Sequence, residues 1–385
     1  MGSLFSKNKS LAILPEDIIK GEILIRLPVK SLVRFRCVCK SWRYLLSCDP
    51  CFAKSHLAHS CLDCNNATLI VKYRSNRAYE YKLNLLNSQY LKVSGSVNGL
   101  VCVYHNLPNS IPFIGIWNPA TSQYKDFFTQ FKASHIPLDS GVSVGFGFDS
   151  FTDDYKVIFI TMSYDSPSPL VADVYSCNAE SWGNNSIESS FLLHGILFPW
   201  PTIVHGRPYW YNYGVESPEH YFVIYFDLHH EVFKLLPGIK YVMATTQNRV
   251  MVNLRDSLAM LFDYTPDYTP RSVDVYIFNE RSGSWSKNYS VTSIKVPKNM
   301  PLLNCFSNGD LLFRRNLCLN LVTISQESHG INMFGNEVYD YYGPVSKVFC
   351  PCSYSYIESL VSVKGMHPML ISEAESDIFV IDWSF

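Results

Sequence analysis

Residues 14–59 read LPEDIIKGEILIRLPVKSLVRFRCVCKSWRYLLSCDPCFAKSHLAH, a stretch whose pattern differs from that of the rest of the 385-residue chain. Apolar residues recur in it near helical spacing. Pro15 at a first helical position, with acidic residues in the first turn, marks the start of a helix. Pro28 ends that helix and starts a second, and Asp49 is placed as the cap of the last one. The pattern therefore predicts four short helices, the fourth over Phe52 to His59.

This helical block is too short to bury a large core by itself, so we expect it to pack against a partner.

The net charge of the helical block differs from that of the rest of the chain. Residues 1–59 hold ten Lys and Arg against four Asp and Glu, a net +6, and the remaining residues hold 22 against 29, a net −7. An acidic partner is favoured for the block. Nucleic-acid binding is not expected, because the body is acidic and its aromatics do not alternate with Arg and Lys.

The motifs of the block are LP at Leu14, LPVKSL at Leu27, RFRCVCKSW at Arg34 and DPCF at Asp49. In this order they resemble the plant F-box. The resemblance implies docking on a Skp-type adaptor, which joins the chain to a cullin scaffold in an SCF-type ubiquitin ligase. The alternative is a helical cap without a partner. The positions that match the family motif, and that the resemblance makes adaptor-binding, are Leu14, Pro15, Ile18, Ile23, Leu24, Leu27, Pro28, Val29, Leu32, Cys37, Val38, Lys40 and Trp42.

Beyond residue 66 the sequence changes to short runs rich in Val, Ile, Tyr and Phe between turn residues, which is typical of strands. Four of these stretches place two aromatic residues seven positions apart, and a fainter copy has Ile324 and Ile331. The second members recur at steps of 46 to 58 residues, enough for a four-stranded sheet. Hairpins at Asn98, His205 and Arg255 would supply inner strands. The aromatic pairs are Trp117 with Tyr124, Tyr175 with Trp182, Phe226 with Phe233, and Phe278 with Trp285.

The period predicts an all-β propeller-like domain of about six blades after the small N-terminal helical domain, an α+β multidomain chain. An irregular pair of β-sandwiches is the alternative. The expected domains are a disordered N-terminus at 1–10, an F-box at 11–59 and an F-box-associated propeller-like domain at 60–366. Residues 367–385 are expected to form a C-terminal tail or a strand that closes the ring.

Several stretches of the body, among them NGLVCVY at Asn98, WNPATSQY at Trp117, GFGFDSFTDDYKVIFI at Gly145 and FDLHHEVFKLLP at Phe226, resemble the F-box-associated interaction domain. This domain follows the F-box in S-locus F-box-like and F-box kelch-like plant proteins. The resemblance implies a non-catalytic substrate receptor, whose propeller binds a protein for ubiquitination and degradation, in pollen self-incompatibility or immune-receptor turnover. Ser122 departs from the usual Arg, which leaves the target open.

The alternative function is a propeller enzyme or carbohydrate-binding module whose F-box controls only its own turnover. No motif for catalysis or for a cofactor has a convincing context, so we predict no catalytic residue and no cofactor. The pairs Cys48 with Cys51 and Cys61 with Cys64 are spaced too closely for the usual zinc site, and no metal is predicted. His229 and His230 are interpreted as a solvated turn pair.

The start MGSLFSKNK fits a myristoylation pattern with Gly2 as the lipidation site. One acyl chain binds membranes reversibly, so no stable anchoring is expected. No stretch is long and apolar enough for a membrane span, and a cytoplasmic or nuclear location is predicted. Target specificity is expected in loops near His135–Val142, Ser163–Leu170, Val215–His220 and Thr265–Arg271.

Overall fold

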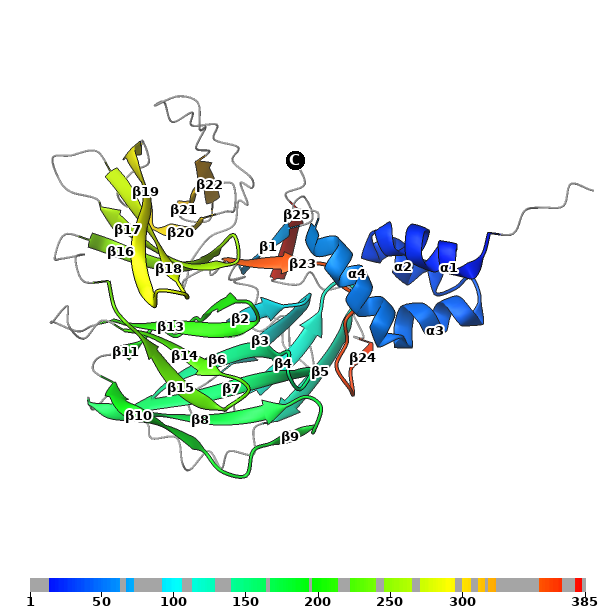
Figure 1. Ribbon diagram of the computed structural model, residues 1–385, viewed down its shortest axis with the longest axis horizontal. Coiled ribbons are helices and arrows are strands. Elements are labelled where there is room, and N and C mark those ends of the chain that lie inside the picture. The colour runs from blue at the N-terminus through cyan, green and yellow to red at the C-terminus, as the bar shows by residue number, and fades with distance from the viewer. Residues whose placement is uncertain are drawn as a thin grey trace, which may run out of the picture.

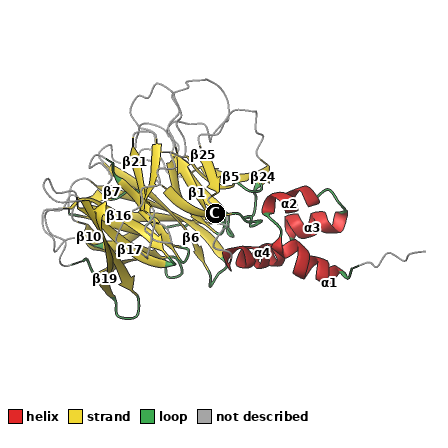
Figure 2. Cartoon of the chain, turned by 90° about the horizontal axis from the view of Figure 1, so that it is seen from above, coloured by secondary structure: helices red, strands yellow, loops and turns green. Residues whose placement is uncertain are grey.

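The chain has a helical block at its N-terminal end and a larger body of antiparallel strands (Figure 1). Seen from above, the block lies at one end of the molecule, with α4 beside the strands (Figure 2). The computed structural model describes residues 14–62, 67–72, 92–105, 113–128, 140–163, 167–193, 196–213, 222–239, 246–264, 271–294, 300–305, 311–315, 318–322, 353–368 and 378–382.

The helical block contains α1 (Glu16–Ile18), a π-helical turn (Ile19–Ile23), a 3-10 turn (Leu24–Arg26), α2 (Val29–Phe35), α3 (Lys40–Cys48) and α4 (Pro50–Leu62). The predicted helices are therefore present, but the first one changes its winding along its length. Pro15 stands one position before the first helical residue, not at it as predicted. Pro28 has the same place before α2, where it separates two helices as predicted. Each proline has an extended ψ and supplies a carbonyl to the first turn instead.

The breaks between the helices follow from single residues. Leu27 is extended, with φ −87° and ψ 144°, because the following proline disfavours helical geometry. Asp49 accepts hydrogen bonds at Oδ1 from the backbone N–H groups of Cys51 (2.9 Å) and Phe52 (3.1 Å), which caps α4. Cys39 caps α3 through a 3.5 Å hydrogen bond from Trp42 N to its sulfur, and this cap was not predicted.

The described strands form six sheets, five of which follow chain order. The first has β2 (Lys92–Val97), β3 (Leu100–His105), β4 (Phe113–Asn118) and β5 (Gln123–Phe128), with β24 (His367–Pro368) at its edge. The second has β6 (Ser140–Asp149), β7 (Asp154–Ser163), β8 (Ser168–Ser176), β9 (Ser181–Trp182) and β10 (Ile187–Leu193). The third has β11 (Ile196–Leu197), β12 (Thr202–Val204), β13 (Arg207–Tyr213), β14 (Val223–Asp227) and β15 (Val232–Leu236).

The fourth sheet has β16 (Thr246–Leu254), β17 (Ser257–Tyr264), β18 (Arg271–Asn279) and β19 (Ser284–Ile294), and the fifth has β20 (Leu302–Cys305), β21 (Leu311–Arg315) and β22 (Cys318–Val322). In the sixth, β1 (Ala67–Lys72) pairs with both β23 (Ser353–Ile357) and β25 (Ile378–Asp382). This sheet joins the first and last strands of the chain. The predicted fold class, a small helical domain followed by an all-β propeller-like domain, is confirmed.

The aromatic pairs of the sequence repeat lie directly opposite each other across hairpins, as predicted. All four pairs are register partners, and the rings of Tyr175 and Trp182 are 5.4 Å apart between centroids. Such pairs hold the register of the two strands. The fifth copy, Ile324 and Ile331, lies outside the described residues.

These four hairpins share a backbone feature that the sequence pattern does not show. The residue two positions before the second aromatic has a positive φ in every copy, and only one of the four is a glycine. A left-handed residue at this place turns the chain back with the twist of the strands. The four residues are Ser122, Glu180, Glu231 and Gly283, with φ of 53°, 54°, 53° and 60°.

Shorter turns close the inner hairpins predicted at Asn98, His205 and Arg255. Each has two consecutive residues of positive φ, which is the geometry of a two-residue hairpin turn. Hydrogen bonds place turns of neighbouring sheets together. Phe148 N donates to Gly206 O at 2.9 Å, and Asn98 Nδ2 donates to Tyr155 Oη at 2.9 Å. We call the side of the body that carries these inner turns the turn face, and the side with the opposite strand ends the loop face.

The helical block and the first two sheets share one hydrophobic core. Leu24, Leu32 and Phe52 of the block are buried in the same cluster as Leu100 and Phe146 of the body. The block was expected to need a partner for its apolar surface. Part of that partner is the body of the same chain.

Candidate docking surface and target pocket

The thirteen predicted adaptor-binding positions fall into three groups in the structure. Leu24, Val29 and Leu32 are buried, and they are therefore core residues of the block. Leu27 and Trp42 are half-buried and pack on the same core. The exposed group consists of Leu14, Pro15, Ile18, Ile23, Pro28, Cys37, Val38 and Lys40.

The exposed group includes four large apolar side chains that the described chain leaves partly open to solvent. Leu14 is 52% exposed, Ile18 45%, Ile23 40% and Val38 61%. Tyr44 of α3 is 67% exposed and was not predicted. Its signal in the sequence is weak, because Trp42 nearby takes the inward position. We call Leu14, Ile18, Ile23, Val38 and Tyr44 the exposed apolar set.

Half-buried residues join α2 to α3 beneath this set. The rings of Phe35 and Trp42 pack with centroids 5.7 Å apart, which joins α2 to α3. The guanidinium of Arg36 donates two hydrogen bonds, of 2.8 and 3.2 Å, to the carbonyl of Leu46 near the end of α3. Such contacts satisfy a carbonyl that the helix end leaves without a partner.

Helix α4 fixes the block to the turn face of the body. Lys54 Nζ lies 2.5 Å from Asp153 Oδ2 in the turn between β6 and β7. On the other side of α4, His56 Nε2 lies 2.8 Å from the Leu27 carbonyl oxygen. Burial lowers the pKa of His56 below its ordinary value, so the ring is held neutral and donates from Nε2 to that carbonyl.

The structure describes three of the four paired cysteines. Cys48, Cys51 and Cys61 are exposed free thiols, and Cys64 lies outside the described residues. Within the described ranges, no group of three or more His, Cys, Asp or Glu side chains is placed to hold a metal ion. Gly2 also lies outside these ranges.

His229 and His230 lie exposed in the turn between β14 and β15, as predicted. Asp227 Oδ1 accepts hydrogen bonds from both backbone N–H groups at 3.1 Å, and Lys234 Nζ lies 2.6 Å from Asp227 Oδ2. Burial alone would raise the pKa of Asp227, but the hydrogen bonds from Lys234 and His230 outweigh it and lower that pKa. These bonds hold the turn between β14 and β15 together, and the backbone N–H groups of both histidines take part in them.

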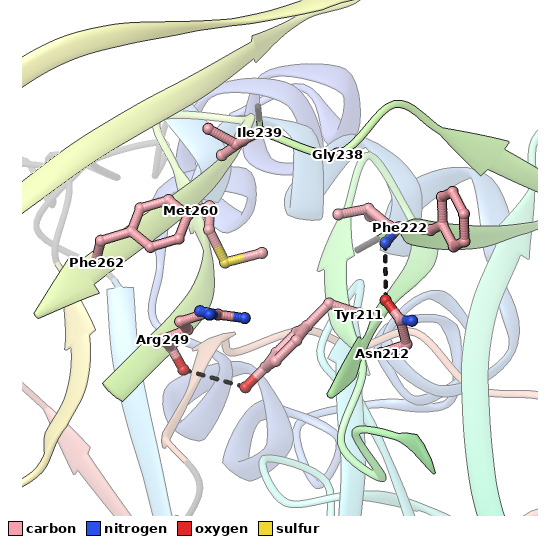
Figure 3. A pocket seen from close by; sticks show the side chains of 9 residues that line it. Tyr211, Asn212, Phe222, Gly238, Ile239, Arg249, Met260 and Phe262 are labelled. Atoms are coloured by element: carbon pink, nitrogen blue, oxygen red, sulfur yellow. Dashed lines mark hydrogen bonds between the residues drawn. The ribbon is translucent and has the colours of Figure 1, made fainter. Parts of the chain in front are cut away.

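On the loop face, a pocket opens between the third and fourth sheets (Figure 3). Its volume is about 40 Å³, and it lies where β13 ends and β14 and β16 begin. The sequence loops predicted to carry specificity connect strand ends on this face, and most of their residues lie outside the described ranges. The residues that line the pocket are Tyr211, Asn212, Phe222, Val223, Gly238, Ile239, Arg249, Met260 and Phe262.

None of the helices in the described ranges is long and apolar enough to cross a membrane. Comparison with known proteins gives two family matches. Residues 11–54 match the F-box domain, and residues 54–363 match the F-box associated beta propeller domain.

Similar proteins occur in Arabidopsis thaliana. The F-box/kelch-repeat protein At3g23880 is 28% identical over 311 residues, covering 73% of this chain and 80% of that protein. The F-box protein CPR1 is 28% identical over 334 residues, covering 75% of each.

Among solved structures, TolB from Acinetobacter baumannii aligns with a TM-score of 0.38 at 9% identity, over 70% of this chain and 67% of that one. An exo-beta-1,3-galactanase from Phanerochaete chrysosporium aligns with a TM-score of 0.35 at 11% identity, over 57% and 55%. These scores are too low to carry an argument about function. The two family matches together span almost the whole described chain, and the protein belongs to the F-box proteins that carry an F-box associated beta propeller domain.

Proposed function

We propose that this chain is the substrate-recognition subunit of an SCF-type ubiquitin ligase. The exposed apolar set of the helical block binds a Skp-type adaptor, and through it a cullin scaffold. The body binds a target protein for ubiquitination. The chain itself is non-catalytic, and it raises the rate of ubiquitin transfer by holding the target close to the subunits that carry out the chemistry.

The observation that carries this proposal is the distribution of exposed apolar side chains. Of the nine large hydrophobic residues that are exposed in the described chain, five lie between Leu14 and Tyr44. Concentrated exposed apolar surface marks an interaction site, because it costs free energy to leave it in water. The buried residues beside it show that the block is folded and can present this surface to a partner.

The position of the helical block on the body supports the proposal that the body binds a target protein. Helix α4 holds the block on the turn face through Lys54 and Asp153. The loop face therefore lies at the strand ends away from this contact. A target bound there leaves the adaptor surface free.

A double substitution tests adaptor binding. Ile18→Asp with Val38→Asp places two charges in the exposed apolar set without touching the buried core. Central contacts of an interface each contribute about 2 kcal/mol or more, so we expect adaptor affinity to fall by a factor of about 30 or more. Co-purification and calorimetry with a plant Skp-type adaptor measure this change.

The matched control is Phe151→Asp. Phe151 is 82% exposed but lies in the body, in the turn between β6 and β7. The Phe151→Asp variant should bind the adaptor with the affinity of the unmodified chain. Unchanged adaptor binding by the double variant would overturn the proposal. Leu27 is unsuitable for this test, because it is half-buried and its carbonyl is bonded to His56.

A further inference from the structure

A short segment late in the chain contacts both the helical block and the body. Residues 358–366 join β23 to β24, and we call them the strap. Leu360, Val361 and Val363 of the strap are buried in the hydrophobic core that the block shares with the first two sheets. Helix α4 also lies against β23, where the strap begins (Figure 1). The strap therefore lies at the junction of the two regions.

Buried hydrogen bonds fix the strap to the first sheet. Asn118 Nδ2, at the end of β4, donates to the carbonyls of Ser359 (3.0 Å) and Val361 (2.8 Å). Ser359 Oγ donates to the Asn98 carbonyl at 2.6 Å and accepts from Val361 N at 3.2 Å. Asn118 and Ser359 are both fully buried. Since a buried polar group that loses its partner costs free energy, these bonds strongly favour one position of the strap.

The strap also fits closely over the inner turn at Asn98. Gly99 in this turn has φ +79°, and a Cβ at that position would clash with Ser359 Oγ and lie 2.7 Å from the Ile357 carbonyl oxygen. Glycine thus allows the close approach of the turn and the strap.

The other end of the strap is held by a cluster of ion pairs. Lys125 Nζ of β5 donates to the Lys364 carbonyl at 2.7 Å and to Glu180 Oε1 at 2.7 Å. Glu180 Oε2 also pairs with Lys364 Nζ at 2.8 Å. Because Glu180 lies in the turn between β8 and β9, this end of the strap is bonded to the first sheet and to the second.

The direct contacts between the block and the sheets fix direction less well. Lys54 and Asp153 form an ion pair whose side chains are 56% and 58% exposed, and exposed pairs contribute little to stability. The apolar contacts of the shared core are strong but non-directional. The strap differs from both, because directional buried bonds hold it on the body while its apolar side chains face the core of the block.

We propose that the strap sets the orientation of the helical block on the body, and that Ser359 and Asn118 are its positioning residues. This inference rests on the proposed function as a substrate receptor. Ubiquitin transfer by proximity requires a defined separation between the adaptor and the bound target. Loosening the strap should leave both binding surfaces intact, widen the range of block orientations and slow the transfer.

The test measures distances between the two regions by pulsed EPR in the full chain, free and bound to its adaptor. Nitroxide labels are attached to p-acetylphenylalanine in place of Lys30 in α2 and Leu192 in β10, which are both exposed. Cysteine labelling is unsuitable, because several described cysteines are exposed. The unmodified chain should give one narrow distance distribution. In Ser359→Ala the distribution should be about twice as broad, because two buried hydrogen bonds are lost.

Ser143→Ala is the matched control. Ser143 is also fully buried, its Oγ donates to the Pro199 carbonyl at 2.8 Å, and it accepts from Trp210 Nε1 at 2.8 Å. This substitution should cost similar stability but leave the distance distribution narrow. A distribution in Ser359→Ala as narrow as that of the unmodified chain, or equal broadening in Ser143→Ala, would overturn the proposal.

A second variant covers the case in which Ser359→Ala does not fold. Glu180→Ala removes the ion pairs at the other end of the strap, where the carboxylate side chain is 36% exposed, so the fold should survive. It should also broaden the distance distribution. An unchanged distribution in Glu180→Ala would then count against the strap.

The proposed function is judged separately in the same samples. Ser359→Ala should bind the adaptor with unchanged affinity but ubiquitinate captured plant proteins about tenfold more slowly, because proximity is less well defined. If it transfers ubiquitin at the unmodified rate, the strap inference fails and the receptor function stands. If the unmodified chain does not bind the adaptor, the receptor function fails whatever the distances show.

Discussion

The helical block and the strand body are built from contacts of very different range along the chain. In the block, the longest described side-chain bonds, from Lys20 to Asp49 and from His56 to the Leu27 carbonyl, each span 29 residues. In the body, β1 pairs with β25, which places Thr68 opposite Asp382. A short continuous sequence is therefore enough to identify the block. The sheets of the body are assembled from segments that no single motif contains.

The largest loss of stability that should affect the body and not the helical block is expected from a substitution of Asp263. Asp263 and Arg271 form a buried ion pair with side chains 2% exposed, and Arg271 also donates to the Met300 carbonyl at 2.7 Å. Asp263→Ala leaves the guanidinium buried with part of its partners gone, which costs about 3–5 kcal/mol. Faster hydrogen exchange in β17 to β21 would report this loss. Adaptor affinity should not change, because these sheets have a core separate from that of the block.

The matched control for Asp263→Ala is Lys287→Ala in the same sheet. Lys287 pairs with Asp274 at 2.8 Å, but its side chain is 45% exposed. An exposed pair of this kind contributes about 1 kcal/mol or less. A loss of adaptor affinity in Asp263→Ala would show that the two regions unfold together.

Much of the fold could be predicted because local patterns suffice for it. The prolines marked the starts of α1 and α2 to within a residue, and the seven-residue aromatic spacing gave the hairpin register. Asp49 was correctly placed as the cap of the last helix, but that helix runs over Pro50–Leu62 and is longer than the predicted Phe52 to His59. The positive φ at Ser122, Glu180 and Glu231 could not be predicted, since residues other than glycine give no signal for it. The hairpin geometry that the four copies share, not the preference of the residue itself, imposes that conformation.

The site was predictable only in part for the same reason. The motif gave thirteen positions but did not show which of them are buried. Leu32 is buried and Ile18 is exposed, and this difference depends on how the helices pack. Tyr44 was missed because no periodic pattern marks it. The pocket was missed because its residues come from separate segments: Tyr211 lies in β13, Phe222 just before β14, and Arg249 in β16. The volume between them exists only after two sheets are placed side by side.

As the pH falls, the helical block should lose stability before the body does, because of His56. Burial lowers the pKa of this ring in the folded chain, so folding favours its neutral form. The stability that it contributes is complete above the ordinary pKa of about 6.5 and is lost as the pH falls below that value toward the folded pKa. The protection factors of residues 14–62, which correct hydrogen exchange for its intrinsic pH dependence, should therefore fall between pH 7.5 and pH 5.5.

His56→Gln keeps a donor for the Leu27 carbonyl but does not titrate, so it should remove this acid response. His205→Asn is the control, because His205 is exposed in a turn of the body and asparagine accepts its positive φ. It should keep the response of the unmodified chain. An acid response in His56→Gln equal to that of the unmodified chain would contradict the assignment.

The smallest expected effect tests whether the four aromatic hairpins are equivalent copies. Gly283 has φ +60° and open space where a Cβ would lie, so Gly283→Ala costs only the left-handed backbone conformation, about 1 kcal/mol. Ser122 has the same conformation in the first hairpin. Ser122→Gly removes the cost of the left-handed conformation there. The greater freedom of glycine in the unfolded state offsets part of this gain, so the net stabilisation should be about 0.5 kcal/mol. Urea unfolding of both variants measures the two changes. Opposite signs would show that the repeated hairpins use the same left-handed turn, whereas destabilisation by both would mean that the serine side chain is required in its own copy.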